Sequence, residues 1–424
     1  MADKNEAMQS VPDVVERFMR YVQIPSQSDP DREDVTPSSN GQFKMADYLA
    51  QELKGLGLSG VGVDEHAYVL ATLPASQGLE DLPALGLCAH IDTSFDAPAD
   101  GIKPHIVHYE GGDLVAGIVE GKPVSLDPEE IPYLKQFVGQ YIVCSDGTTL
   151  LSADDKAGVA EIVALLARLI AHPEIQHPTL KIAFVPDEEI GHGAELLDLD
   201  EFGAAWCYTV DGEEIGEFSY ECFNAASAVV QAKGRMVHPG SAKNIMINAI
   251  TLLNQFDRML PEAQRPEYTE GHEGFFHPIS IQGSAAEASC EYIIRDHDAK
   301  LFQDRQDYML RCARFLNERY GEELVKVTLK QEYRNMAEKF GDVPFLIDNA
   351  LKAYEQAGIE PCVKAIRGGT DGAQLTFRGL PCPNIATGGS QAHSVHEFIP
   401  VSTMEVTVNI LENLVQLFAV AQKA

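Results

Sequence analysis

Basic side chains are scarce in this sequence. Its 424 residues contain 32 Lys and Arg against 64 Asp and Glu, which gives a formal net charge of −32. A chain with this excess of negative charge is repelled by nucleic acids and by anionic membrane surfaces. The composition therefore argues against both as partners, while the surplus of carboxylates is compatible with binding hard cations.

Long apolar runs are also missing. The longest helical candidate, residues 157–172, is interrupted by Glu161 and Arg168 and falls short of the roughly 18 apolar residues of a membrane span. The first residues are polar and amphipathic, without the apolar core of a secretory signal. We therefore expect a cytoplasmic protein with no membrane partner.

Paired cysteine motifs are absent. The eight cysteines are scattered, none forms a C-x-x-C pair, and most stand in apolar surroundings. This pattern predicts reduced core residues rather than a disulfide framework.

The remaining composition is that of a globular protein, with 45% hydrophobic and 23% charged residues. At about 150 residues per domain, the length predicts two or three domains. Strand-like runs at 84–90, 180–185 and 206–210, with an amphipathic helical segment at 157–170, predict an α/β sheet covered by helices.

A central segment has a different pattern. Residues 223–334 are predicted to form strand, helix, two strands, helix and strand, the βαββαβ order of a ferredoxin-like domain. Residues beyond 335 return to α/β character. We therefore predict an α/β catalytic domain of residues 1–222 plus 335–424, interrupted by an inserted domain of residues 223–334.

Five segments place carboxylates or imidazoles where predicted strands end and loops begin. Ligands of open α/β sheets bind at the carboxyl ends of strands, so these side chains are expected to meet at one edge. The segments are residues 88–93, 152–158, 185–191, 208–212 and 392–397.

Each segment also has a structural interpretation. His90 and Asp92 alternate along a predicted strand and share a face, so Asp92 can hold the tautomer of His90. An isolated His-x-Asp sequence is, however, often only structural. Asp154 stands at a helix start, where an aspartate is commonly an N-cap. Asp211 precedes a glycine and can belong to an ordinary turn. His393 lies in a glycine-rich run with few apolar neighbours to bury it.

Three consecutive acids, residues 187–189, are harder to explain structurally. They follow an apolar strand directly, and their charges repel one another. A function would explain this cost, because one carboxylate can bind a metal while its neighbour takes a proton from water. The alternative is an acidic loop in an acidic protein.

Together the segments supply two imidazoles and three acids from one predicted sheet edge. Two divalent ions that share a bridging carboxylate need about this ligand set. The lack of available cysteine ligands is consistent with hydrolytic rather than structural zinc.

The most specific motifs are LLSADDKAGVAEI (150–162), PDEEIGHGA (186–194), YTVDG (208–212), HPGSAKNIMINA (238–249) and IRGGTDGAQLTFRGLPCPNIATGG (366–389). Through them, nearly the whole chain resembles the co-catalytic dizinc metallopeptidases related to aminoacylases and glutamate carboxypeptidases. Within that superfamily it is most similar to the peptidase T branch, the tripeptide aminopeptidases. The resemblance implies a zinc-peptidase-like catalytic domain with the insert as a lid or dimerisation domain.

The resemblance also implies a ligand set. It implies two Zn²⁺ per chain, with Co²⁺ or Mn²⁺ as possible substitutes. Asp154 would bridge the two ions, with His90 and Asp211 completing one site and Glu189 and His393 the other. His393 is preferred to the nearby second imidazole of the segment because the family's ligand stands four residues before a Glu.

Four further residues receive roles from the resemblance. Glu188 would be the general base, and Asp92 would orient the imidazole two residues before it. In the insert, His238 would stabilise the oxyanion and Arg295 would bind a substrate carboxylate.

The implied activity is release of the N-terminal residue of a tripeptide by a water activated by two zinc ions and a Glu base. The alternatives are an N-acyl amino acid deacylase or carboxypeptidase of the same superfamily, or a catalytically silent metal-binding protein. A two-metal phosphohydrolase is disfavoured because no phosphate-cradling loop is seen. The expected partner is a short peptide, and the expected state is a monomer or homodimer.

Overall fold

The computed structural model describes residues 10–32 and 34–420. It divides the chain into two compact units. Unit 1 consists of Met1–Tyr220, Lys339–Lys364 and Thr370–Ala424, and unit 2 consists of Glu221–Glu338 and Ala365–Gly369. Unit 2 thus differs from the predicted insert by a few residues at each end and by the short segment 365–369, which the sequence pattern did not assign to it.

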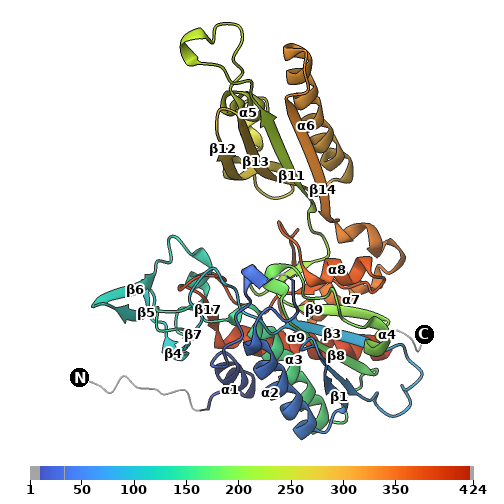
Figure 1. Ribbon diagram of the computed structural model, residues 1–424. Coiled ribbons are helices and arrows are strands. Elements are labelled where there is room, and N and C mark those ends of the chain that lie inside the picture. The colour runs from blue at the N-terminus through green and yellow to red at the C-terminus, as the bar shows by residue number, and fades with distance from the viewer. Residues whose placement is uncertain (1–9, 33, 421–424) are drawn as a thin grey trace. The chain divides into compact units, whose positions relative to one another are not determined.

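The main sheet of unit 1 has the order β1-β2-β8-β3-β9-β16-β10-β15 in the described residues (Figure 1). Its strands are β1 (Ser59–Val63), β2 (Val69–Leu73), β3 (Leu85–His90), β8 (Leu180–Val185), β9 (Trp206–Val210), β10 (Glu217–Ser219), β15 (Cys362–Val363) and β16 (Asn384–Ile385). The central strands β8, β3 and β9 run parallel, and β16 runs parallel to β9. Every residue of β3 is buried, because a central parallel strand is covered on both faces.

The helices of unit 1 are α1 (Asp13–Tyr21), α2 (Asn40–Leu56), α3 (Ala153–Ala171), α4 (Leu199–Phe202), α7 (Phe345–Gln356), α8 (Asp371–Phe377) and α9 (Val401–Val420). Helix α3 packs on β3 and β9 and is itself covered by α1 and α9. Most of its side chains are therefore buried. Gly158 allows this close approach, since a Cβ there would stand 1.9 Å from the carbonyl oxygen of Val210.

Two smaller sheets complete unit 1. One has the order β17-β7-β4, with β17 (Phe398–Pro400), β7 (Tyr141–Cys144) and β4 (His105–His108), and the other pairs β5 (Leu114–Val119) with β6 (Lys122–Leu126). Aromatic residues between β4 and β7, among them Tyr109, Tyr133 and Phe137, form a separate core beside these two sheets. The sequence pattern did not predict these strands, because they are short and their burial does not alternate regularly.

Unit 2 has the βαββαβ order expected from the sequence. Its elements are β11 (Asn224–Lys233), α5 (Ala249–Asp257), β12 (Phe275–Gly283), β13 (Glu287–Asp296), α6 (Ala299–Tyr320) and β14 (Val325–Tyr333). The strands form an antiparallel sheet in the order β12-β13-β11-β14, and both helices pack against it. Burial alternates along β13, as expected for a sheet with one covered face.

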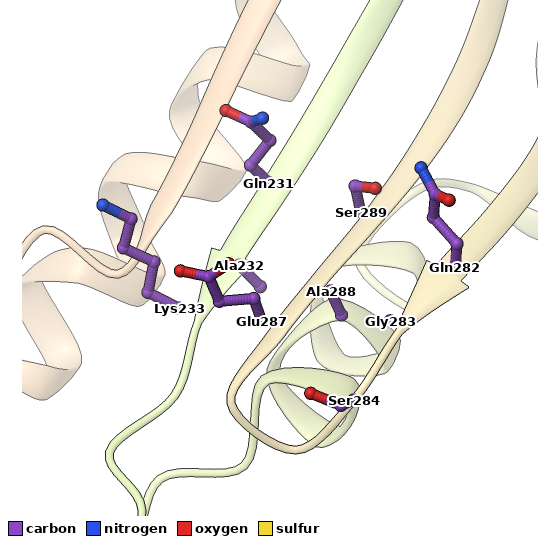
Figure 2. A pocket seen from close by; sticks show the side chains of 9 residues that line it. All are labelled: Gln231, Ala232, Lys233, Gln282, Gly283, Ser284, Glu287, Ala288 and Ser289. Atoms are coloured by element: carbon purple, nitrogen blue, oxygen red, sulfur yellow. The ribbon is translucent and has the colours of Figure 1, made fainter.

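An open groove of about 650 Å³ lies at one end of this sheet, beside the β12–β13 hairpin (Figure 2). It is lined by Gln231, Ala232, Lys233, Gln282, Gly283, Ser284, Glu287, Ala288 and Ser289. The lining contains one amine, one carboxylate and no imidazole. It therefore does not offer the nitrogen and oxygen ligand set of a catalytic metal site.

The predicted state of the cysteines agrees with the structure. All eight are free, and all except Cys362 are buried. None of the described helices combines the length and apolar character needed to cross a membrane.

Candidate metal centre

The predicted ligands of unit 1 come from adjacent positions at one edge of the main sheet. His90 is the last residue of β3, and Asp211 directly follows the neighbouring strand β9. Glu189 lies in the short turn η3 (Glu188–Ile190), which follows β8 on the other side of β3. Asp154 lies in the first turn of α3, which packs over the same strands. Residues distant in sequence thus meet where parallel strands end.

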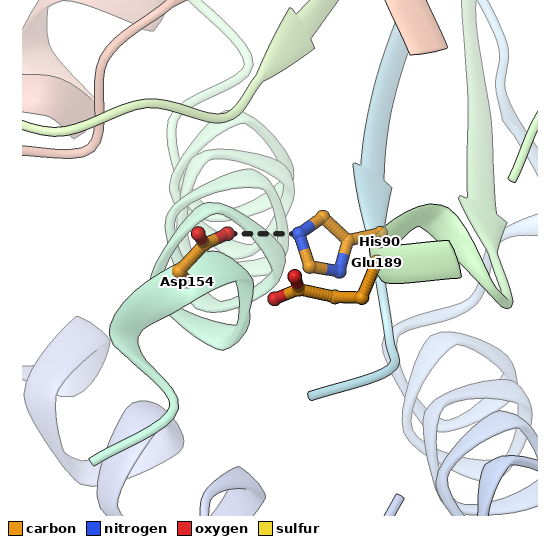
Figure 3. A group of neighbouring side chains, drawn as sticks. All are labelled: His90, Asp154 and Glu189. Atoms are coloured by element: carbon orange, nitrogen blue, oxygen red, sulfur yellow. Dashed lines mark hydrogen bonds and ion pairs between the residues drawn. The ribbon is translucent and has the colours of Figure 1, made fainter. Parts of the chain in front are cut away.

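Asp154 stands between two imidazoles. Its Oδ1 lies 2.8 Å from Nε2 of His90, and its Oδ2 lies 3.3 Å from Nε2 of His393. Figure 3 shows the first of these contacts, with the Glu189 carboxylate beside it. Burial alone would raise the pKa of Asp154, but hydrogen bonds from His393 and His90 hold this pKa below its usual range. The two oxygens of one carboxylate therefore face two different nitrogen donors.

His393 and Glu189 form the second half of the arrangement. Nε2 of His393 lies 2.9 Å from Oε2 of Glu189, and its Nδ1 lies 2.9 Å from Oδ2 of Asp96. The other Glu189 oxygen, Oε1, is buried and has no hydrogen-bond partner among the described residues. Burial, followed by the charge of Asp154, raises the pKa of Glu189 to about 7. The structure thus brings His393 to the centre, and Asp96 orients it, a role the sequence pattern did not reveal.

Two groups of side chains have metal-ligand spacing. His90, Asp154 and Glu189 each offer an atom within 4.8 Å of the others, and so do His90, Asp155 and Asp211. Asp155 was not among the predicted ligands, because it follows Asp154 in what reads as the start of a helix. It is fully buried, its Oδ2 accepts the backbone N–H of His90 at 3.1 Å, and its Oδ1 has no partner among the described residues.

Asp92 lies behind His90, as expected. Its Oδ1 is 3.2 Å from Nδ1 of His90, a close approach rather than a well-aligned hydrogen bond. Its two oxygens also accept the backbone N–H groups of Glu188 and Glu189, both at 3.1 Å. Asp92 is completely buried, so these contacts are shielded from water. It therefore lies against the His90 imidazole and accepts hydrogen bonds from the backbone of the acidic turn.

Glu188 lies in that turn with a half-buried side chain. Burial is the main cause that raises the pKa of its carboxyl well above the usual value, and the negative charges of Asp371 and Asp211 add to it. A carboxyl group with a raised pKa is suited to exchange protons near neutral pH.

Buried polar contacts hold the chain on both sides of η3. Before it, the Asp187 carboxylate accepts the N–H of Ser38 at 2.7 Å and the amide of Gln42 at 2.6 Å. After it, the buried Asp371 carboxylate lies against the backbone of Gly193. Gly193 is required here, since a Cβ would stand 2.3 Å from Oδ1 of Asp371. The acidic turn is therefore fixed by its surroundings.

The other two predicted site residues lie in unit 2. His238 is exposed, and its Nδ1 accepts the N–H of Gly240 at 3.1 Å. Arg295 is largely buried: its guanidinium lies 3.0 Å from Glu332 and stacks over the ring of Tyr333 at 5.3 Å. A substrate carboxylate at Arg295 would therefore compete with Glu332, and no local sequence pattern predicts this pairing.

The residues present fit divalent metal ions. Imidazole nitrogens and carboxylate oxygens are the donors that zinc, cobalt and manganese accept in hydrolytic sites. The partnerless oxygens of Glu189 and Asp155 are buried carboxylate atoms that a cation would satisfy.

Comparisons with known proteins agree with this arrangement. The model of peptidase family M20/M25/M40 matches residues 152–417. Proteins called peptidase T are 46% identical over 408 residues in Clostridium acetobutylicum and 45% identical over 407 residues in Bacillus velezensis. Both alignments cover 96% of this chain, and they cover 99% and 98% of those relatives.

Solved structures show the same fold. Aminopeptidase PepT from Bacillus cereus superposes with a TM-score of 0.75 at 22% identity, covering 96% of this chain and 99% of that one. A dinuclear metal-binding peptidase of the M20 family from Bacillus subtilis gives a TM-score of 0.64 at 14% identity, covering 96% and 97%. These findings confirm the predicted α/β fold class and the predicted metallopeptidase class. By its sequence and its fold, the chain belongs to peptidase family M20/M25/M40.

Proposed function

We propose that this chain is an aminopeptidase that releases the N-terminal residue of tripeptides and uses two divalent metal ions, zinc in the first instance. The observation that carries the proposal is the placement of Asp154 between His90 and His393. Its support from relatives is the full-length similarity to proteins called peptidase T and the fold shared with a Staphylococcus aureus tripeptidase, at a TM-score of 0.75.

In this proposal Asp154 is shared by both ions. His90 and Asp211 complete one site, and Glu189 and His393 complete the other. Asp155 lies close enough to His90 and Asp211 to stabilise the first site by its charge. When bound, the two ions would polarise the scissile carbonyl group and lower the pKa of a water molecule.

Glu188 is the proposed general base. It takes a proton from the attacking water and delivers it to the nitrogen of the leaving dipeptide. The first step needs the ionised carboxylate and the second step its protonated form, so one group serves both. Asp92 accepts the backbone N–H of Glu188, so the backbone of the base is held close to His90.

Unit 2 supplies the proposed substrate contacts. His238 would donate to the carbonyl oxygen as negative charge develops on it. Arg295 would bind the C-terminal carboxylate of the peptide and thereby set the peptide length, once Glu332 gives way. Equal cleavage of a tripeptide and its C-terminal amide would contradict this role of Arg295.

The test is a product analysis by mass spectrometry. Purified protein supplied with zinc is given a free tripeptide, its N-acetyl form, and the matching dipeptide and tetrapeptide, with Glu188→Ala as control. We expect one N-terminal residue to be released from the free tripeptide alone. Cleavage of the acetylated form would instead indicate an acylase, and no cleavage despite bound metal would refute the substrate assignment. Light scattering of the same sample distinguishes a monomer from a homodimer.

A further inference from the structure

The carboxylate of Glu397 lies against the chain segment that carries Asp154. Its Oε2 accepts the backbone N–H groups of Leu151 and Ser152, each at 2.7 Å. Its Oε1 accepts the backbone N–H of Asp154 at 3.0 Å. Glu397 is only 2% exposed, so water does not replace these bonds when they are lost.

The segment held by Glu397 has an unusual backbone. Ser152 adopts a left-handed conformation, with φ of 65°, directly before α3. This conformation is unfavourable for a residue other than glycine and persists only where neighbouring contacts fix it. Helical backbone does not satisfy the N–H groups at the start of a helix, so they need other acceptors. Glu397 provides that acceptor for Asp154 in the first turn of α3, and it also accepts the N–H groups of Leu151 and Ser152 directly before the helix.

Glu397 belongs to the same loop as His393. Ser390 and Phe398 close this loop at its base by two backbone hydrogen bonds, of 3.0 and 3.1 Å. Glu397 stands at that base, next to Phe398, and reaches the Asp154 segment from there. The Asp154 and His393 side chains meet at 3.3 Å. The same carboxylate therefore joins the two segments whose side chains form the shared part of the centre.

We propose that Glu397 is a positioning residue of the metal centre, which fixes segment 151–154 and so the direction in which Asp154 presents its two oxygens. The proposal rests on the proposed function, in which Asp154 binds both ions. In this proposal Glu397 is not itself a ligand, and its two oxygens accept backbone N–H groups. It acts on the backbone of a ligand, whereas Asp92 acts on the imidazole of one.

The chain offers a matched control in Glu161. This residue is also fully buried and lies in α3, but neither of its oxygens has a hydrogen-bond partner among the described residues. Replacing either glutamate by glutamine removes one buried carboxylate with little change in shape. Only the change at residue 397 removes acceptors from the Asp154 segment.

The experiment titrates metal-free protein with Co²⁺ in the presence of a competing chelator and records the visible spectrum of the bound ion. Glu397→Gln should weaken Co²⁺ binding about 10- to 100-fold, the usual effect of losing a group that orients a ligand, and should change the spectrum. Glu397→Asp keeps the charge on a shorter side chain, so we expect an intermediate affinity. Glu161→Gln should match the wild type in both affinity and spectrum.

Wild-type affinity and spectrum in Glu397→Gln would overturn the proposal, even if tripeptide hydrolysis were lost. Circular dichroism of the metal-free variants monitors folding. If Glu397→Gln does not fold, the Co²⁺ affinity and spectrum of Glu397→Asp test the proposal instead. If neither variant folds, the proposal is overturned and Glu397 serves the stability of unit 1. The titration needs no substrate, so a wild-type protein that binds Co²⁺ but does not cleave tripeptides would refute the proposed function alone.

Discussion

The backbone N–H of Glu188 donates a hydrogen bond to Oδ1 of Asp92 at a distance of 3.1 Å. The same oxygen lies 3.2 Å from the His90 imidazole. One buried carboxylate therefore sets the distance between a proposed metal ligand and the proposed base. The contact is made by the backbone of the base and not by its side chain.

Asp92→Asn should disturb both the His90 imidazole and the backbone of the turn that carries Glu188. An amide offers one acceptor oxygen where the aspartate offers two, so either the N–H of Glu188 or that of Glu189 loses its partner. We expect zinc affinity to fall by about 10- to 100-fold, together with a lower kcat. Competitive zinc titration and steady-state kinetics with a tripeptide measure the two effects. An unchanged zinc affinity would show that Asp92 does not orient His90.

Glu188→Ala should retain metal and lose catalysis. The side chain is the proposed proton carrier but not a proposed ligand, and general acid–base groups contribute about 10²- to 10⁴-fold in rate. Metal content by mass spectrometry should equal that of the wild type, while kcat should fall by this factor. Turnover near the wild-type rate would remove Glu188 from the role of base.

Asp154→Ala should prevent binding of both ions, because Asp154 alone is shared between the two proposed sites. His90 and His393 would each lose the carboxylate oxygen that they face. The metal-to-protein ratio after dialysis against a fixed free zinc concentration measures the effect. A ratio near that of the wild type would rule out the bridge, and Glu161→Gln serves as the control with an unaffected ratio.

Gly158→Ala should destabilise the fold and disturb the centre. A methyl group there would stand 1.9 Å from the carbonyl oxygen of Val210, the residue before Asp211, so α3 and β9 must separate. Overpacking of this kind costs about 1–3 kcal/mol. Gly55→Ala in α2, where a Cβ meets nothing within 4 Å, should instead raise the free energy of unfolding by about 0.5–1 kcal/mol. Urea unfolding of both variants checks the opposite signs.

Glu161→Gln should stabilise the protein increasingly as the pH rises. Burial raises the pKa of Glu161 well above its usual value. Above about pH 4.3 the unfolded chain has lost a proton that the folded chain keeps, so wild-type stability falls with rising pH. In the glutamine variant residue 161 does not titrate, so this fall in stability is absent. The difference in free energy of unfolding should grow by up to about 1.4 kcal/mol per pH unit from pH 4.3 upward. A difference independent of pH would contradict the prediction.

The sequence predicted the fold class because its strong signals are local. The apolar runs that became β3, β8 and β9 were readable from composition and length, and the βαββαβ order of unit 2 followed from periodicity. The strand ends then pointed to His90 and Asp211. No strand was predicted at β10 or β16, because two or three residues carry no periodicity.

The surroundings of the centre could not be predicted in the same way. Asp96, Asp155 and Glu397 act through contacts made over long distances in sequence, and no local pattern separates them from the other acids of an acidic chain. In the sequence, Glu397 was used only to choose His393 as the ligand, because the ligand of the family stands four residues before a Glu. Likewise, the pairing of Arg295 with Glu332 depends on the register of unit 2's sheet.

The position of β16 has a consequence for biosynthesis. This strand comes from residues 384–385, yet it lies between β9 and β10 in the main sheet, and β17 from residues 398–400 pairs with β7. A nascent chain whose β9 and β10 have emerged from the ribosome therefore has a gap in its sheet until residues 384–385 have also emerged. His393 and Glu397 emerge at the same late stage. The proposed metal centre therefore cannot be completed before this segment has been synthesised, and a chain terminated before residue 393 lacks one of its proposed ligands.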